Sequence, residues 1–204
     1  MARAPKKKAY HHGDLRRALV DASIAILHEE GAGALTLRSA ARRVGVSHAA
    51  PKNHFGDVRG LLEAIAVVGF RGLTDAMNEA RARTSDPLAR LVGIGEAYVR
   101  FAMTSAGHFR AMFHPALGER VVDGDLDVAS RETFGVLVQS MEEARTAGIV
   151  RDGDVLEASL AAWTMVHGLS TLAVDHHLAR KGFDRDPVDL AGAIAQQLFL
   201  GLRA

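Results

Sequence analysis

The sequence predicts an all-α protein, in which an N-terminal three-helix unit with a helix-turn-helix precedes a C-terminal helical bundle, about nine helices in total. Apolar residues recur at helical spacing along most of the 204-residue chain, and we find neither an alternating strand pattern nor an internal repeat of roughly 20–50 residues. The hydrophobic fraction of 48% is high enough for a sizeable core.

The first elements are a basic arm and an amphipathic helix. Residues 1–12 contain three consecutive lysines and are expected to form a disordered arm. From Asp14 onward, Leu15, Leu19 and Ile26 mark one stripe of a helix. Glycines at 31 and 33 are expected to end it.

Three further helices complete the N-terminal region. Each is preceded by a residue whose short polar side chain is a good N-cap: Thr36 for a helix ending at Gly45, Ser47 for a helix ending near His54, and Asp57 for a long helix ending near Ala82. The rest of the chain predicts a bundle of helices over 87–105, 108–114, 126–147, 155–180 and 187–202. We therefore divide the chain into an arm (1–12), a helix-turn-helix domain (13–57) and a larger domain (58–204).

The formal net charge of +1 hides a strong asymmetry between the two ends of the chain. Residues 1–60 hold 11 basic and 5 acidic residues, whereas residues 61–204 hold 14 basic and 19 acidic residues. A basic head on an acidic body is expected when one end of a protein meets a polyanion. The alternative, a solubilising tail, accounts for Lys6–Lys8 but less well for the arginines inside predicted helices.

Several other classes of protein are disfavoured. The chain has no cysteine, which excludes disulfides and thiolate metal sites, and no apolar run long enough for a signal peptide or a membrane span, so we expect a soluble cytoplasmic protein. The histidines that invite a metal site are His108, His114, His167, His176 and His177. They form no HExxH motif and have no spaced carboxylate pair beside them, so we expect no metal, no cofactor and no catalysis.

The segment RVGVSHAAPKNHF (43–55) carries the main functional signal. In a helix-turn-helix the second helix enters the DNA major groove, and the first crosses the phosphate backbone. Ala49 and Ala50 are short enough for close approach, and Pro51 is tolerated only near the first turn of the helix. The segment therefore predicts contact with double-stranded DNA.

The residues predicted to touch DNA have different roles. The Asn53 amide can form hydrogen bonds with the edge of an adenine, and the Lys52 ammonium group can bind guanine or a phosphate. The Thr36 hydroxyl and the backbone N–H groups at the start of its helix can bind a phosphate. Thr36 and Ser47 are also explained as helix caps, a role compatible with phosphate contact, and His54 suits packing or phosphate better than base reading. The full set is Thr36, Arg38, Ser47, His48, Ala49, Lys52, Asn53, His54 and Arg59.

The stretches YHHGDLRRALVDASIAIL and ALTLRSAARRVGVSHAAPKNHFGDVRGLL resemble the DNA-binding segment of the TetR family of transcriptional repressors, over about residues 10–65. Lys52 stands where the family usually has a phosphate-binding tyrosine, and Val58 where it usually has a phosphate-binding lysine. We expect Lys52 to keep the phosphate contact and Arg59 to supply the missing charge. AWTMVHGL (162–169) and GHFRAMFHP (107–115) resemble segments of the ligand-binding domain of one TetR subgroup.

The resemblance implies that the larger domain dimerises and senses a ligand. Large, soft apolar residues at helical spacing are more often core than cavity lining, but a subset should line a pocket, with His167 as a polar anchor or simply a bonded core histidine. The predicted pocket residues are Phe101, Phe109, Met112, Phe113, Phe134, Trp163 and His167.

The last two predicted helices carry apolar residues on an arc wider than one core-facing stripe. Such an arc needs a second partner, so we expect a two-fold four-helix interface, the alternative being burial within one protomer. The predicted interface residues are Leu160, Leu169, Leu172, Ile194, Leu198 and Leu202.

The sequence thus predicts a homodimeric repressor that a small apolar effector releases from a near-palindromic operator. Two alternatives remain. One is a constitutive DNA-binding dimer whose bundle binds another protein. In that case the bundle would lack an apolar cavity of a few hundred Å³. The other is a metal-dependent enzyme, which would need at least three converging ligands.

Overall fold

The computed structural model describes residues 12–118 and 122–202, in which ten α-helices and two short 3₁₀ segments occur. The α-helices are α1 His12–Glu29, α2 Leu37–Val44, α3 Ala49–Phe55, α4 Val58–Ala82, α5 Pro87–Thr104, α6 Ala106–Met112, α7 Asp125–Thr146, α8 Val155–Val174, α9 His177–Arg180 and α10 Pro187–Gly201. The all-α class is confirmed, since no strand occurs in these residues. The predicted arm lies outside them, apart from the first residue of α1.

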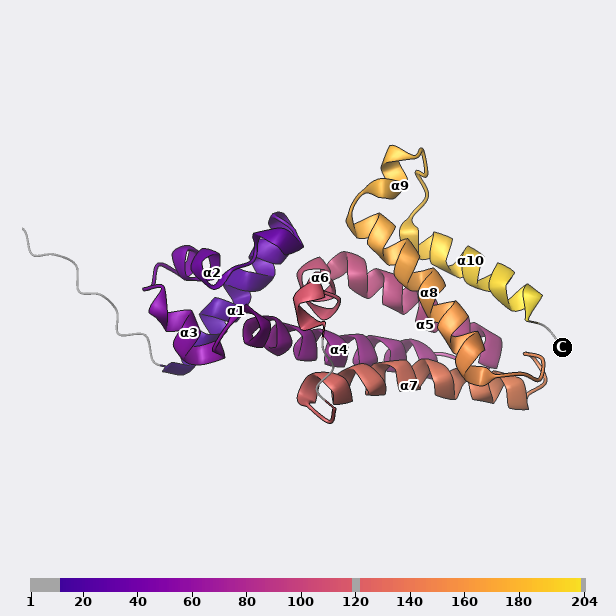
Figure 1. Cartoon of the computed structure of the whole chain (residues 1–204). Coiled ribbons are helices and arrows are strands. Elements are labelled where there is room, and N and C mark those ends of the chain that lie inside the picture. Colours follow the sequence, from indigo (N-terminus) through magenta and orange to yellow (C-terminus); the bar gives the residue numbers. More distant parts are fainter. Residues whose placement is uncertain (1–11, 119–121, 203–204) are drawn as a thin grey trace, which may run out of the picture.

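The helices are arranged in a small unit and an elongated body (Figure 1). Helices α1, α2 and α3 gather at one end, and α4 runs from them along the body beside α7. Helix α5 packs against α4 on one side and against α8 and α10 on the other, and α10 lies far from α3. The two functional regions expected from the sequence therefore occupy different ends of the molecule.

Local side-chain chemistry explains the start and end of α2. Thr36 and Ser39 form a reciprocal capping box, in which each hydroxyl accepts a hydrogen bond from the other residue's backbone N–H at 2.9 Å. Gly45 ends the helix with φ of 77°, a left-handed conformation that glycine adopts without steric cost. The predicted cap at Thr36 and stop at Gly45 are confirmed.

The start of α3 differs from the prediction. The helix begins at Ala49 with His48 at the N-cap position, rather than with Ser47 as the cap. Pro51 is then the third helical residue, where its missing N–H removes little of the hydrogen-bond ladder. Its ring is buried and anchors α3 to the rest of the unit.

Helix α4 belongs to both hydrophobic cores. Leu61, Leu62 and Ile65 pack with Leu19 of α1 and other residues of the small unit. From Ala66 onward the buried residues of the same helix join the core of the body. The predicted division after residue 57 therefore coincides with the start of a helix that both cores share, and the side chain of Asp57 caps it as predicted.

The long helix predicted over 155–180 is broken in the structure. Helix α8 ends at Val174, His176 has φ of 57°, and α9 starts at His177. The reason is a long-range contact: the carbonyl oxygen of Val174 accepts a hydrogen bond from Arg110 of α6 at 3.2 Å. The guanidinium thus supplies the hydrogen bond that the backbone N–H of the next helical turn would otherwise donate to Val174.

Helix α6 of the body packs against α1 of the small unit. It begins at Ala106, two residues before the predicted start, and Gly107 lies directly against α1. A Cβ atom at Gly107 would lie 2.4 Å from the carbonyl oxygen of Ile24. Only glycine allows this approach without a shift of the backbone.

No helix within 12–118 or 122–202 is both long and apolar enough to cross a membrane.

Substitution Gly107→Ala should lower the free energy of unfolding by about 1–3 kcal/mol, because the new methyl group overlaps the α1 backbone. Urea unfolding followed by circular dichroism measures this change. The matched control is Gly135→Ala on α7, where a Cβ meets no atom within 4 Å; that variant should gain about 0.5–1 kcal/mol from helix propensity. Equal effects of the two substitutions would contradict the assigned contact.

Candidate functional site

Helix α3 presents a polar face to solvent. His48, Ala49, Lys52 and Asn53 are exposed, whereas Pro51 is buried. Exposed Ser47 precedes the helix. The structure therefore places the predicted contact residues of this segment, apart from His54, on one accessible surface.

The first turn of α2 lies beside this surface, and it also bears predicted contacts. Thr36 and Arg38 are exposed. The Thr36 hydroxyl is used within the cap, where it also donates to Ser39 Oγ at 3.1 Å. The backbone N–H groups of the first turn and the Arg38 guanidinium remain the stronger phosphate donors here.

Two cations of this region, Arg43 and the predicted contact Arg59, have carboxylate partners. Arg43 is paired with Glu29 at 2.6 Å and Glu30 at 3.4 Å, so its charge is largely balanced and it ties α2 to the end of α1. Arg59 Nε lies 2.9 Å from Glu63 on the next turn of α4. His54, the last predicted contact, is half-buried and packs at 6.2 Å from the Phe55 ring.

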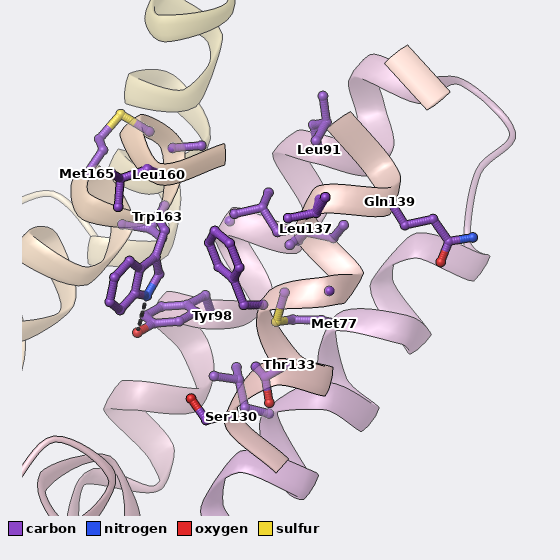
Figure 2. Close-up of a pocket in the computed structure, with 18 of the residues that line it drawn as sticks. Met77, Leu91, Tyr98, Ser130, Thr133, Leu137, Gln139, Leu160, Trp163 and Met165 are labelled. Carbon is purple, nitrogen blue, oxygen red and sulfur yellow. Dashed lines mark hydrogen bonds between the residues drawn. The ribbon is translucent and has the colours of Figure 1, made fainter. Parts of the chain in front are cut away.

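A second site is a cavity of about 1120 Å³ in the body that opens to solvent on one side. Helices α4, α5, α7, α8 and α10 all contribute to its walls. The apolar lining includes Phe70, Leu73, Met77, Ile94, Tyr98, Phe113, Phe134, Leu137, Trp163, Val166 and Phe199. Figure 2 shows Met77, Leu137 and Trp163 around this space. Its size and composition suit a small apolar molecule.

The lining contains three of the seven predicted pocket residues, namely Phe113, Phe134 and Trp163. The other four pack nearby but outside it. Phe101 lies against Gly72, Met112 lies against Gly69, and Phe109 packs on Tyr98 with ring centroids 6.1 Å apart. The Nδ1 atom of His167 is 2.9 Å from the Tyr98 hydroxyl oxygen, which makes it a bonded core histidine rather than a lining residue.

An aromatic cluster surrounds His167 behind this wall. The ring of His167 lies 4.3 Å from that of Phe113 and 5.6 Å from that of Trp163. Burial lowers the pKa of His167 and raises the pKa of Tyr98, so both are uncharged at neutral pH. The Tyr98 oxygen accepts from Trp163 Nε1 at 3.3 Å, as the dashed line in Figure 2 marks, and its proton can go to His167 Nδ1.

The predicted dimer residues fall into three groups. Leu160 and Leu172 of α8 are exposed, by 49% and 41%. Leu169 is instead buried in the core of its own protomer. Ile194, Leu198 and Leu202 are half-buried and pack against that core.

Sequence reasoning missed two exposed leucines on the same helices. Leu156 of α8 and Leu200 of α10 are 59% and 63% exposed. Leu156 belongs to the apolar arc of α8, and Leu200 belongs to that of α10. The width of these arcs was the signal in the sequence that could have identified both residues.

Arg110 is a further residue that sequence reasoning missed. One terminal nitrogen donates to the carbonyl oxygens of Leu27 and His28 at the end of α1, at 3.0 and 3.1 Å. The other donates to Val174 at the end of α8 and to Asp175 Oδ1, at 3.2 and 2.9 Å. One guanidinium thus joins the C-terminal ends of two helices, where a positive charge is favoured.

The structure gives the metal hypothesis no support in residues 12–118 and 122–202. No group of three or more histidine and carboxylate side chains lies close enough there to hold an ion. His114 Nε2, for example, is 3.1 Å from the carbonyl oxygen of Ala32.

A helix-turn-helix unit at one end and an apolar cavity in a helical body define a class of transcriptional regulator. A family model of the tetracyclin repressor-like C-terminal domain matches residues 91–198, which is more than half of the chain. The chain therefore belongs to the TetR family of transcriptional regulators, as the sequence motifs indicated.

Individual relatives agree with this assignment. The transcriptional regulator BetI of Burkholderia mallei (strain NCTC 10229) is 41% identical over 80 residues, 38% of this chain and 41% of the relative. The chain thus spans about two fifths of the length of the curated relatives it matches.

Solved structures match over nearly the whole chain. A protein of unknown function from Rhodococcus sp. RHA1 is 32% identical, covers 97% of this chain and 100% of its own, and has a TM-score of 0.78. AibR, solved with isovaleryl coenzyme A and operator DNA, is 14% identical over 91% of this chain and 98% of its own, with a TM-score of 0.69, and shares the fold.

Replacing Arg110 by lysine keeps the charge but removes the fork that reaches both helix ends, so Arg110→Lys should lower the free energy of unfolding by about 1–3 kcal/mol. Amide hydrogen exchange should become faster at the ends of α1 and α8. Arg100→Lys, on the exposed face of α5, is the control and should change neither quantity. Unchanged exchange in Arg110→Lys would argue against the bridge.

Proposed function

We propose that this protein is a homodimeric repressor that binds a near-palindromic operator through α3 and leaves it when a small apolar molecule occupies the cavity. The observation that supports this most is the arrangement of α4. The helix starts beside the exposed α3, packs in the core of the small unit, and then lines the cavity with Phe70, Leu73 and Met77.

The exposed face of α3 divides the work between phosphate and base contacts. Lys52 supplies a positive charge for the backbone, and Asn53 offers an amide that pairs with an adenine edge. Ala49 leaves space beside them for the groove floor. Arg38 and the start of α2 hold the strand that borders the groove.

A second copy is proposed to bind along α8 and α10. Their exposed leucines form an apolar surface that dimerisation would remove from water. In a two-fold dimer, the two α3 helices would enter successive major grooves, about 34–36 Å apart. This geometry requires an operator with two related half-sites.

Release requires that the ligand favour a conformation in which this spacing is lost. Moving the population from 99:1 to 1:99 needs about 5.5 kcal/mol of preference for the released conformation. Two elements would carry the change, α4 from the cavity wall and α6 through the Arg110 bridge between α8 and α1.

The cavity favours this proposal over a constitutive dimer. A bundle that only binds another protein has no use for a cavity of about 1120 Å³ lined mainly by aromatic and aliphatic side chains. The complex of AibR with both isovaleryl coenzyme A and operator DNA supports a fold in which one chain serves both partners.

The first test concerns DNA. Operator fragments are selected from genomic DNA and their affinity is measured by fluorescence anisotropy from 50 to 200 mM salt, a range over which phosphate contacts weaken strongly. Lys52→Ala should weaken binding to all fragments and reduce the salt slope by about one. Asn53→Ala should relax base preference, at a cost of about 1–3 kcal/mol for the best site.

The control for the DNA test is Lys181→Ala, which removes an exposed lysine that follows α9 and is no part of α1, α2 or α3. It should leave both affinity and salt slope unchanged. Failure to select any double-stranded fragment with salt-sensitive affinity would refute the proposed function.

The second test concerns assembly. Leu200→Glu places a charge on the exposed arc of α10 and should convert the dimer to a monomer in sedimentation velocity, because burying an unpaired carboxylate in an interface is costly. Val68→Glu alters an equally exposed residue, 54% accessible, on α4 and should remain dimeric. A Leu200→Glu dimer would exclude this surface as the interface.

A further inference from the structure

We propose that the cavity selects an uncharged molecule and rejects anionic ones, fatty acids and acyl coenzyme A included, because no lining residue that the structure describes is an unpaired cation. This inference rests on the proposed ligand-sensing function and specifies the chemical class of the ligand. It follows from the charges at the rim of the cavity, the polar groups of its wall and the apolar surface between them.

The charged residues of the described lining already have partners. Arg131, the one cation among them, has Asp123 at 2.8 Å and Asp127 at 3.3 Å. Glu142 accepts from Arg145 at 2.6 Å, a bond that lowers the pKa of its carboxyl group. An incoming anion would therefore have to compete with a carboxylate for Arg131.

Glu143 completes the charged part of the lining. It is held by Arg81 of α4 and by Arg90 of α5, the latter at 3.0 Å. Two guanidinium groups thus hold one carboxylate, and neither arginine lines the cavity. A cationic ligand would gain no free carboxylate here.

The hydroxyl groups of Thr133 and Tyr98 in the wall are likewise engaged with the protein. Thr133 Oγ1 donates to a backbone carbonyl oxygen, with Ala129 at 2.9 Å and Phe70 at 3.1 Å, and lies 2.8 Å from Thr74 Oγ1. Tyr98 is bonded to Trp163 and His167. The remaining deep lining is hydrocarbon, so the driving force for binding is burial of apolar surface.

These features set opposite expectations for charged and uncharged molecules. An ion moved into such a space loses its hydration without gaining a partner, which costs several kcal/mol. An uncharged chain gains roughly a fourfold increase in affinity for each methylene group buried. Net charge, rather than length, should therefore decide which of two equally long molecules binds.

The protein contains its own reporter for the experiment. Trp163 is the only tryptophan in the sequence, and it lines the cavity. Its fluorescence is titrated with 1-alkanols of six to twelve carbons, the carboxylates and alkyltrimethylammonium ions of equal length, and decanoyl coenzyme A. Isothermal calorimetry on the same samples checks the stoichiometry.

We expect the alkanols to change the Trp163 emission with affinity rising along the series. The carboxylate, the ammonium ion and the thioester of equal chain length should each bind at least about tenfold more weakly. Equal or tighter binding of any of the three overturns the proposal. So does a lack of response to every alkanol in the series.

A pair of variants tests whether charge at the lining sets this preference. Ser130 of α7 lines the cavity and is half-buried (Figure 2). Ser130→Lys adds a cation there and should raise the affinity for decanoate about tenfold over Ser130→Gln, which adds a long uncharged side chain. Equal decanoate affinity in the two variants would overturn the proposed origin of the selectivity.

The outcome can be separated from that of the proposed function. Operator affinity is measured on the unliganded protein, without any of these probes. Charge selectivity with no operator binding would leave the cavity assignment standing and remove the repressor. Operator binding together with preferred binding of anions would support the repressor and refute the proposed selectivity of the cavity.

Discussion

Helix α4 is the constraint on which the arrangement of this molecule depends. Its first turns, through Leu61, Leu62 and Ile65, fill the core of the small unit, and its later turns, through Leu73 and Met77, fill that of the body. Since protein interiors are close-packed, neither core can rearrange around this helix without displacing it in the other. A displacement of α4 at the cavity would therefore reach the core of the small unit directly.

Local chemistry made the N-terminal helices predictable. Thr36, Gly45 and Asp57 act within one turn of their own position, through a capping box, a left-handed residue and a capping carboxylate. The end of α8 could not be predicted in this way. The apolar pattern continues past Val174, and the group that ends the helix is Arg110, 64 residues earlier in the sequence.

The two candidate sites differ in the same respect. The exposed residues of α3 could be predicted because a short helix after a tight turn leaves few choices for its exposed face. The cavity needed distances that a sequence does not contain. Phe134 and Phe109 look alike as large residues on helical stripes, yet Phe134 lines the cavity and Phe109 packs behind it on Tyr98. Leu73 and Phe199 were missed for the same reason, since lining and core residues share one apolar pattern.

The separation of charge along the chain has a kinetic consequence. Exposed Arg38, Arg42 and Lys52 lie in the small unit, whereas the acidic excess belongs to the body at the opposite end. Such a molecule has a dipole along its length, and the field of a polyanion turns its basic end forward before any contact forms. A larger share of diffusional collisions then begins in a productive orientation, so the association rate should be high at low ionic strength and fall steeply as salt screens the field.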